Sequence, residues 1–203
     1  MRPPPADSDA LRSLRGVLEL RARLNDAIRR FFRDRGFLEV DTPVAIPANA
    51  PESNIDAITA GTGWMRTSPE LHMKRLLAAG YEKIFQLGPC GRHGEHGRWH
   101  HPEFTLLEWY RANAGYLEIL ADTKALLSFL AQELRGTTDF LWQGKPVSLA
   151  QELWEKFTVS QAFIQHAGWD PARVFDPDRF DLDLVTRVEP ALPPHPPPLP
   201  VRL

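Results

Sequence analysis

The chain has 203 residues and a mass of 23.0 kDa, with 43% hydrophobic and 25% charged residues, the balance of a globular protein with a core. Its net charge of -2 gives no bulk electrostatic reason to expect a nucleic-acid or membrane partner. A single cysteine excludes an internal disulfide, and no run approaches the ~20 apolar residues of a membrane span. The composition therefore predicts a soluble, cytoplasmic protein.

The first fifty residues show a helix followed by a strand. Residues 1–10 carry no pattern and are expected to be flexible. Apolar residues then recur at three- and four-residue steps from Leu11 to Gly36, which predicts a helix that the glycine ends. Alternation predicts a strand over Phe37–Thr42, with Leu38, Val40 and Thr42 on one face, ended by Pro43. The Pro-, Ala-, Asn- and Gly-rich stretch Ile46–Gly63 is typical of a loop.

The next segment predicts a helix and two strands. Ser68 and Pro69 are favourable residues for a helix start and Gly80 for its end. Strands are predicted over Ile84–Leu87 and Glu103–Ala112, with a Gly- and His-rich loop between them. In the second strand, alternation places four residues on one face: Phe104, Leu106, Glu108 and Tyr110. The opposite face carries Thr105, Leu107, Trp109 and Arg111.

The remaining patterns are mostly helical. A long helix is predicted over Tyr116–Leu134, with Gly136 as its cap. Weaker patterns predict a strand at Phe140–Trp142 before a turn at Gly144, and short helices at Ser160–Ala167 and Arg179–Val188.

Groups able to carry chemistry are concentrated between Met65 and Arg111. Five of the seven histidines lie there: His72, His93, His96, His100 and His101. Their spacing matches no standard zinc pattern and no cysteine partners are present, so no metal site is predicted among them. Arginines in a loop between two strands are suited to an anionic ligand such as a nucleotide phosphate. An acid and a phenol on one strand face, Glu108 and Tyr110, are suited to a cation or an amine.

Three segments carry a family resemblance: "GFLEVDTPV", "RTSPELHMKRLL" and "FQLGPCGRHGEHGRWHHPEFTLLEWY". Together they resemble the catalytic core of class II aminoacyl-tRNA synthetases, in the lysyl-tRNA synthetase branch, including its paralogues that attach (R)-β-lysine to elongation factor P. The resemblance extends from about Leu14 to Pro190. It implies an α+β fold, an antiparallel sheet flanked by helices, that is truncated at its C-terminal side.

The resemblance also implies roles for individual residues. Pro43 ends motif 1, which builds the dimer interface of a homodimer. Arg92 matches the motif 2 arginine that clamps the α-phosphate of ATP and would be the catalytic residue, because a fixed guanidinium stabilises the charge that gathers during carboxylate attack. The implied amino-acid contacts are Ser68, Pro69, Glu70, Glu108 and Tyr110. The implied ATP contacts, besides Arg92, are His93, Gly94, Glu95 and His101.

Two departures from the family pattern affect the expected activity. The family has Asn and then Glu after the motif 2 arginine, where this chain has His93 and Gly94, with Glu95 one step later. Two further family segments are not found in the sequence. One is the strand whose glutamate binds metal, and the other is motif 3, which carries the second ATP-binding arginine. We therefore expect ATP and Mg²⁺ as cofactors, with the metal ligands in the missing part, and a chain that is weakly active or inactive.

Three functions stay open at this point. The first is activation of lysine or β-lysine with transfer to a lysine of elongation factor P. The second is a truncated lysyl-tRNA synthetase that charges tRNA. The third is a non-catalytic, synthetase-like protein that keeps the dimer surface and binds a partner.

The sequence predicts four segments and an abnormal end. These are a flexible start at 1–10, the motif 1 and motif 2 half of the catalytic domain at 11–136, a helical or insert segment of that domain at 137–190, and a disordered proline-rich tail at 191–203. Seven of the last fourteen residues are proline. Because codons for Leu199–Leu203, read one base later, can encode Phe-Leu-Tyr-Asp, an aromatic strand typical of the family, we expect the tail to result from a frameshift.

Overall fold

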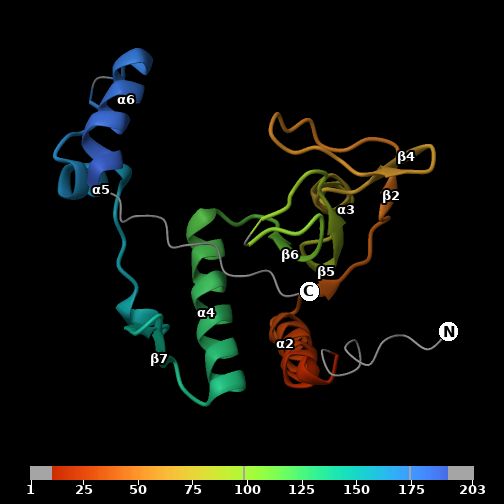
Figure 1. Cartoon of the computed structure of the whole chain (residues 1–203). Coiled ribbons are helices and arrows are strands. Elements are labelled where there is room, and N and C mark those ends of the chain that lie inside the picture. The colour runs from red at the N-terminus through yellow and green to blue at the C-terminus, as the bar shows by residue number, and fades with distance from the viewer. Residues whose placement is uncertain (1–10, 98, 174, 192–203) are drawn as a thin grey trace. The chain divides into compact units, whose positions relative to one another are not determined.

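The computed structural model describes residues 11–97, 99–173 and 175–191 (Figure 1). The expected flexible start and almost all of the proline-rich tail lie outside the described residues. Two compact units divide the chain, Met1–Glu152 and Leu153–Leu203. The boundary falls inside the predicted 137–190 segment, and each unit is described by itself.

The first unit begins with the predicted long helix, α2 (Arg15–Arg33). The backbone leaves the helix through Gly36, whose φ of +77° is a conformation that favours glycine. Only the second half of the helix enters the core, through Ala27, Ile28, Phe31 and Phe32. Residues 11–23 are all exposed.

The main sheet has three strands in the order β1-β5-β6. β5 (Lys83–Gly91) and β6 (Glu103–Arg111) form an antiparallel hairpin in which Gln86 pairs with Glu108. β1 (Leu38–Glu39) pairs with β5 in parallel. This mostly antiparallel sheet with helices on both sides confirms the α+β expectation.

The prediction of a strand over Phe37–Thr42 was wrong in the length of the strand and in the residues assigned to one face. Regular pairing covers only β1, and Leu38 is 51% exposed whereas Phe37 is 5% exposed. The reason is that the Phe37 ring packs edge-on against Phe32, at a centroid distance of 5.1 Å, which turns Phe37 toward the core. Thr42, which was predicted to share a face with Leu38, is buried.

The stretch expected to be a loop, Ile46–Gly63, contributes to a second, small sheet. Its strands are β2 (Ala45–Ile46), β3 (Thr59–Ala60) and β4 (Gly63–Met65), in the order β2-β4-β3. Strands this short carry too few residues to produce a visible alternation. Gly63 is required for the close approach, since a Cβ there would lie 2.6 Å from the Ile46 carbonyl oxygen.

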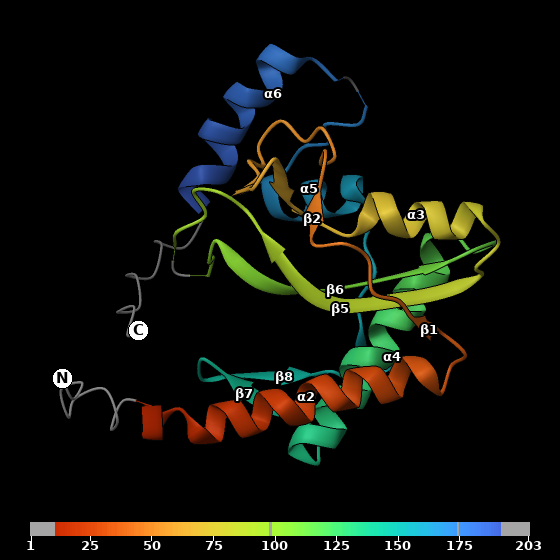
Figure 2. The same cartoon turned by 90° about the vertical axis from the view of Figure 1, so that its right-hand side faces the viewer.

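Helices cover the two sides of the β5–β6 hairpin (Figure 2). On one side lies α3 (Glu70–Ala78), which is followed by Gly80 as predicted. On the other side lie α2 and α4 (Tyr116–Arg135), the latter ended by Gly136 at a φ of +75°.

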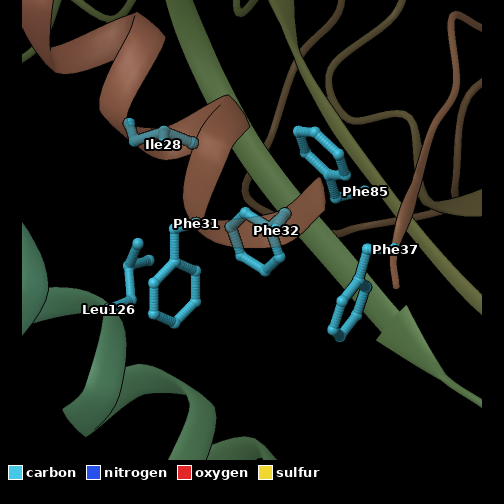
Figure 3. Packing of buried hydrophobic residues seen from close by; sticks show 6 residues of the cluster. All are labelled: Ile28, Phe31, Phe32, Phe37, Phe85 and Leu126. Atoms are coloured by element: carbon cyan, nitrogen blue, oxygen red, sulfur yellow. The ribbon is translucent and has the colours of Figure 1, made fainter. Parts of the chain in front are cut away.

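An aromatic core joins α2 and α4 to the sheet (Figure 3). Its buried members are Ile28, Phe31, Phe32, Phe37, Phe85 and Leu126. The Phe32 ring lies at its centre, stacked on Phe85 at 4.9 Å and 5.3 Å from the Trp109 ring. Leu107 and Trp109 pack against this core, which confirms the strand face predicted to be opposite Glu108 and Tyr110.

The first unit also contains a second hairpin. β7 (Asp139–Trp142) confirms the predicted strand and pairs with β8 (Lys145–Ser148), which was not predicted. The turn between them has positive φ at both Gln143 and Gly144, as a tight hairpin turn requires.

The second unit is helical, as predicted. α5 (Val159–Ala167) is capped by Thr158, and α6 (Pro177–Asp183) is capped by Asp176 and continues into a wider turn over Leu184–Val188. Rings from both helices and their connection form a small cluster: Phe163, Trp169, Phe175 and Phe180. Among the described residues, no helix is both long and apolar enough to cross a membrane.

Candidate functional site

The candidate site lies on the α3 side of the β5–β6 hairpin and is centred on the Glu108 carboxylate. Ser68, which lies just before α3, donates its hydroxyl to Glu108 Oε1 at 2.6 Å. Tyr110 donates its hydroxyl to Glu108 Oε2 at 2.8 Å. Ser68 Oγ in turn accepts the Glu70 backbone N–H at 3.0 Å, which fixes the serine at the helix start. The structure thus brings together three residues that the sequence assigned to one amino-acid site.

The two partners of Glu108 act as hydrogen-bond donors at all ordinary pH values. Burial, followed by the hydrogen bond to Glu108 and the negative charge of that residue, raises the pKa of Tyr110 well above its usual 10.0. Among the described residues, no Lys, Arg or His forms an ion pair with Glu108. A carboxylate that is oriented by two neutral hydroxyls and lacks a cation is suited to receive an ammonium group.

The other two predicted amino-acid contacts lie at the start of α3. Pro69 is fully buried. Glu70 forms an ion pair with Lys74, one helical turn later, rather than with a member of the Ser68–Glu108–Tyr110 cluster. Its charge is nevertheless near enough to contribute to the raised pKa of Tyr110.

Arg92 lies at the end of β5, next to the amino-acid segment. Its Nε donates to the Thr67 carbonyl oxygen at 3.4 Å, and its guanidinium lies 5.1 Å from the centroid of the Phe104 ring. Arg92 Nη1 is 3.7 Å from Glu95 Oε1, so Glu95 contacts the predicted phosphate-binding arginine directly. The predicted phosphate clamp and the predicted amino-acid segment are therefore neighbours, joined at Thr67–Ser68.

The histidines on either side of the motif 2 loop lie in different places. His93 lines a cavity of about 470 Å³ with Asp56 and Trp64, beside Gly94, whose φ is +75°. His101 lines another cavity, of about 550 Å³, between the hairpin and α2, together with Arg21 and Thr105. The structure does not bring His101 to the side where Arg92 contacts Thr67, and its contact with ATP stays a prediction.

The glycines in "GPCG" have a structural reason that the sequence did not reveal. A Cβ at Gly91 would lie 2.5 Å from Met65 Sδ and 3.1 Å from Ile58 Cδ1. Met65 therefore fills the space that a side chain at position 91 would need. Between the two glycines, Cys90 is buried and burial raises the pKa of its thiol, which argues against a nucleophilic role.

Sequence reasoning also missed four polar residues that support the site. Asn49 accepts hydrogen bonds from the Thr67 backbone N–H, at 2.8 Å, and from its hydroxyl. Thr42, Arg66 and Gln86 form a buried polar cluster under the Ser68 segment. One signal was available: a glutamine in the middle of the apolar strand run Ile84–Leu87 indicates a buried hydrogen-bonding partner.

The residues needed for nucleotide chemistry are only partly present. Arg92, whose guanidinium lies over the Phe104 ring, provides a cation of the kind that binds a phosphate. No group of three or more His, Cys, Asp or Glu residues within the described ranges is arranged to hold a metal ion.

Comparison with known proteins identifies the family of this chain. Residues 10–187 match the family model of class II tRNA synthetases of the D, K and N type. A lysine–tRNA ligase from Carboxydothermus hydrogenoformans is 34% identical over 169 residues, which cover 81% of this chain and 34% of that protein. A lysine–tRNA ligase from Chromohalobacter salexigens is 35% identical, with 82% and 34% covered.

Relatives with a different name match equally well. An elongation factor P–(R)-β-lysine ligase from Hamiltonella defensa is 37% identical over 161 residues, which cover 74% of this chain and 44% of that protein. The chain thus spans between a third and under half of the length of these relatives. The family match covers most of the chain, and this protein belongs to the class II tRNA synthetases of the D, K and N type.

Proposed function

We propose that this chain forms the amino-acid and α-phosphate half of an ATP-dependent ligase site that activates lysine or β-lysine as an aminoacyl-adenylate. The observation that carries the proposal is the Glu108 carboxylate, which accepts hydroxyls from Ser68 and Tyr110 and has no cationic partner among the described residues. A lysine-type substrate brings the missing ammonium group.

The chemistry of the site favours an amine over a neutral ligand. A carboxylate in a partly buried position gains a charge-assisted hydrogen bond from an ammonium, which is about twice as strong as a neutral one. Ser68 and Tyr110 hold both carboxylate oxygens in place, so the acceptor is already oriented when the substrate arrives. A neutral side chain of the same length leaves the carboxylate unpaired.

Arg92 supplies the second half of the proposed reaction. In adenylate formation, a carboxylate oxygen of the amino acid bonds to the α-phosphorus of ATP while the bond to pyrophosphate breaks. The guanidinium of Arg92, held beside Thr67, neutralises the charge that collects on the α-phosphate. The family resemblance implies that the Mg²⁺ ligands belong to a C-terminal part of the catalytic domain that is not found in this sequence.

We propose a lysine of elongation factor P as the acceptor of the activated acyl group. Relatives named for this reaction match at 37% identity, and lysine–tRNA ligases match at 33–36%, so both acceptors are carried into the test below. Transfer to tRNA is the alternative. A non-catalytic binding protein is the third candidate, favoured by the changed loop in which Arg92 contacts Glu95.

Calorimetric titration with L-lysine, (R)-β-lysine and norleucine tests the amino-acid site. L-Lysine and (R)-β-lysine are expected to bind. Norleucine lacks the side-chain ε-amino group and is expected not to bind. Glu108→Gln is expected to weaken lysine binding about 10- to 100-fold, the equivalent of losing a charged hydrogen bond of about 1.5–3 kcal/mol. Equal binding of norleucine, or unchanged binding by Glu108→Gln, contradicts the proposal.

Glu103→Gln is the matched control and is expected to leave lysine binding unchanged. Glu103 is an exposed acid on the same strand as Glu108, but it lines the cavity beside α2. Adding ATP, Mg²⁺ and labelled lysine then separates the two acceptors. Label on elongation factor P supports the proposed acceptor, and label on tRNA supports the alternative. Lysine binding without ATP-pyrophosphate exchange fits both the non-catalytic protein and a chain that holds only half of the ligase site.

A further inference from the structure

Arg66 is a buried arginine without an assigned role. It follows β4, immediately precedes the Thr67–Ser68 segment, and is only 1% exposed. Within the described residues it forms no ion pair with a carboxylate. Burying a guanidinium without an opposite charge costs free energy, which hydrogen bonds from Arg66 to carbonyl and hydroxyl oxygens partly offset.

The Arg66 side chain connects two segments that are distant in sequence. Nε donates to the Pro89 carbonyl oxygen at 2.8 Å, in β5. Nη1 donates to the Thr42 carbonyl oxygen at 2.5 Å and to Thr42 Oγ1 at 3.0 Å, in the chain that follows β1. The planar fork of arginine, unlike the point charge of lysine, can direct donors to both segments at once.

The Arg66 backbone makes a second set of bonds to the same two segments. Its N–H donates to the Val44 carbonyl oxygen at 2.8 Å, and its carbonyl accepts the Gly91 N–H at 2.9 Å. The residue is therefore held on both sides through backbone and side chain. These bonds at Arg66 fix the backbone where it leads into Thr67 and Ser68.

A buried polar cluster extends this connection to the sheet under Glu108. Thr42 donates its hydroxyl to Gln86 Oε1 at 3.0 Å and its backbone N–H to the same oxygen at 3.2 Å. Gln86 is the direct cross-strand partner of Glu108. Thr42, Arg66 and Gln86 thus link the segment that carries Ser68 to the strand position opposite the carboxylate that Ser68 contacts.

The Arg66 guanidinium lies close to the backbone of β5 at Gly88. Arg66 Nη2 is buried, and a Cβ at Gly88 would lie 2.8 Å from it. Gly88 has an ordinary backbone conformation, so the reason for a glycine there is the close approach of Arg66 rather than φ. The absence of a side chain at Gly88 therefore leaves the space that the Arg66 guanidinium occupies on the α3 side of the hairpin.

We propose that Arg66 is the positioning residue of the amino-acid site. Its guanidinium holds the Thr67–Ser68 segment against β5, and through Ser68 it sets the orientation in which Glu108 meets the substrate ammonium. This inference rests on the proposed function for its effect on lysine binding. The positioning itself is a property of the ligand-free chain.

Hydrogen exchange and lysine titration on two variants test the proposal. Arg66→Met removes the donors, and Gly88→Ala keeps Arg66 but places a methyl group 2.8 Å from Nη2, closer than carbon and nitrogen can approach. Both are expected to raise amide exchange at least tenfold in 42–44 and 66–70, and to weaken lysine binding at least tenfold. If Arg66→Met fails to fold, Gly88→Ala alone decides the outcome.

Arg111→Met is the matched control, because Arg111 pairs with Asp122 at the far end of β6. It is expected to leave exchange in 42–44 and 66–70 and lysine affinity unchanged, even where it lowers thermal stability. Native exchange in those segments in Gly88→Ala or Arg66→Met overturns the positioning role. Absence of lysine binding by the unmodified chain contradicts the proposed function instead, and the exchange result still decides the role of Arg66.

Discussion

The two faces of the β5–β6 hairpin contrast in chemistry. The face toward α2 carries Phe85, Leu87, Leu107 and Trp109, which join a core of stacked and edge-on rings. The face toward α3 carries Gln86 and Glu108, which accept hydrogen bonds from the side chains of Thr42 and Ser68, and Tyr110, which donates its hydroxyl to Glu108. Strand alternation separates the two sets by one residue.

The difference indicates how stability and binding are divided. Burial of apolar rings contributes free energy with little dependence on exact orientation, so the α2 face can stabilise the unit. Buried polar groups cost free energy unless every partner is in place, so the α3 face specifies geometry more than it stabilises. We expect substitutions on the two faces to have different effects.

The largest effect is expected on the apolar face. Phe32 is fully buried between Phe31, Phe37, Phe85 and Trp109. Phe32→Ala is expected to lower the free energy of unfolding by about 3–5 kcal/mol, the usual cost of removing a buried phenylalanine. Urea denaturation measures the change. Leu18→Ala, at a residue of α2 that is 58% exposed, is expected to change it by less than about 0.5 kcal/mol.

A smaller effect is expected where the two sheets meet. Gly91→Ala places a methyl group 2.5 Å from Met65 Sδ, and overpacking of this kind costs about 1–3 kcal/mol. Met65→Ala in the same chain is expected to remove most of the cost of the Gly91 substitution. A double-mutant cycle by urea denaturation gives the coupling, and additive effects would show that Met65 does not fill this space.

The smallest effect is expected on the polar face and depends on pH. The pKa of Tyr110 is raised above 10.0 in the folded chain by burial and by Glu108, so above pH 10 the unfolded chain binds fewer protons than the folded chain. The free energy of unfolding therefore falls as pH rises past 10, by at most ~1.4 kcal/mol per pH unit for one proton. Tyr110→Phe is expected to reduce this fall in urea denaturation between pH 8 and 11, and the raised pKa of the buried Cys90 thiol accounts for a remaining part.

Tyr116→Phe is the control for the pH experiment, since Tyr116 is 77% exposed. It is expected to keep the pH dependence of the unmodified chain. If Tyr110→Phe and Tyr116→Phe behave alike, the Tyr110 hydroxyl is not held by Glu108.

The sequence could predict the apolar face better than the polar one. Periodicity found α2, α4 and both hairpin strands, because each repeats a local pattern over many residues. The short strands β2 and β3 were missed because two residues carry no period. The family resemblance supplied Ser68, Glu108 and Tyr110.

The support beneath these residues could not be read from local pattern. Thr42 hydrogen-bonds to Gln86, which is 44 residues away in sequence, and to Arg66, which is 24 residues away. No periodicity links residues so far apart. A buried arginine also resembles a surface arginine in sequence, since only its carbonyl partners distinguish the two. The polar partners of a site therefore require the fold before they can be assigned.

The most direct test of the division between the two faces is a lysine titration followed by side-chain NMR signals of Tyr110 and Trp109. These neighbours on β6 point to opposite faces, so each reports on one of them. The account predicts that lysine shifts the Tyr110 ring signals and leaves the Trp109 indole signal unchanged. A shift confined to Trp109, or to residues of the cavity beside α2, would contradict it.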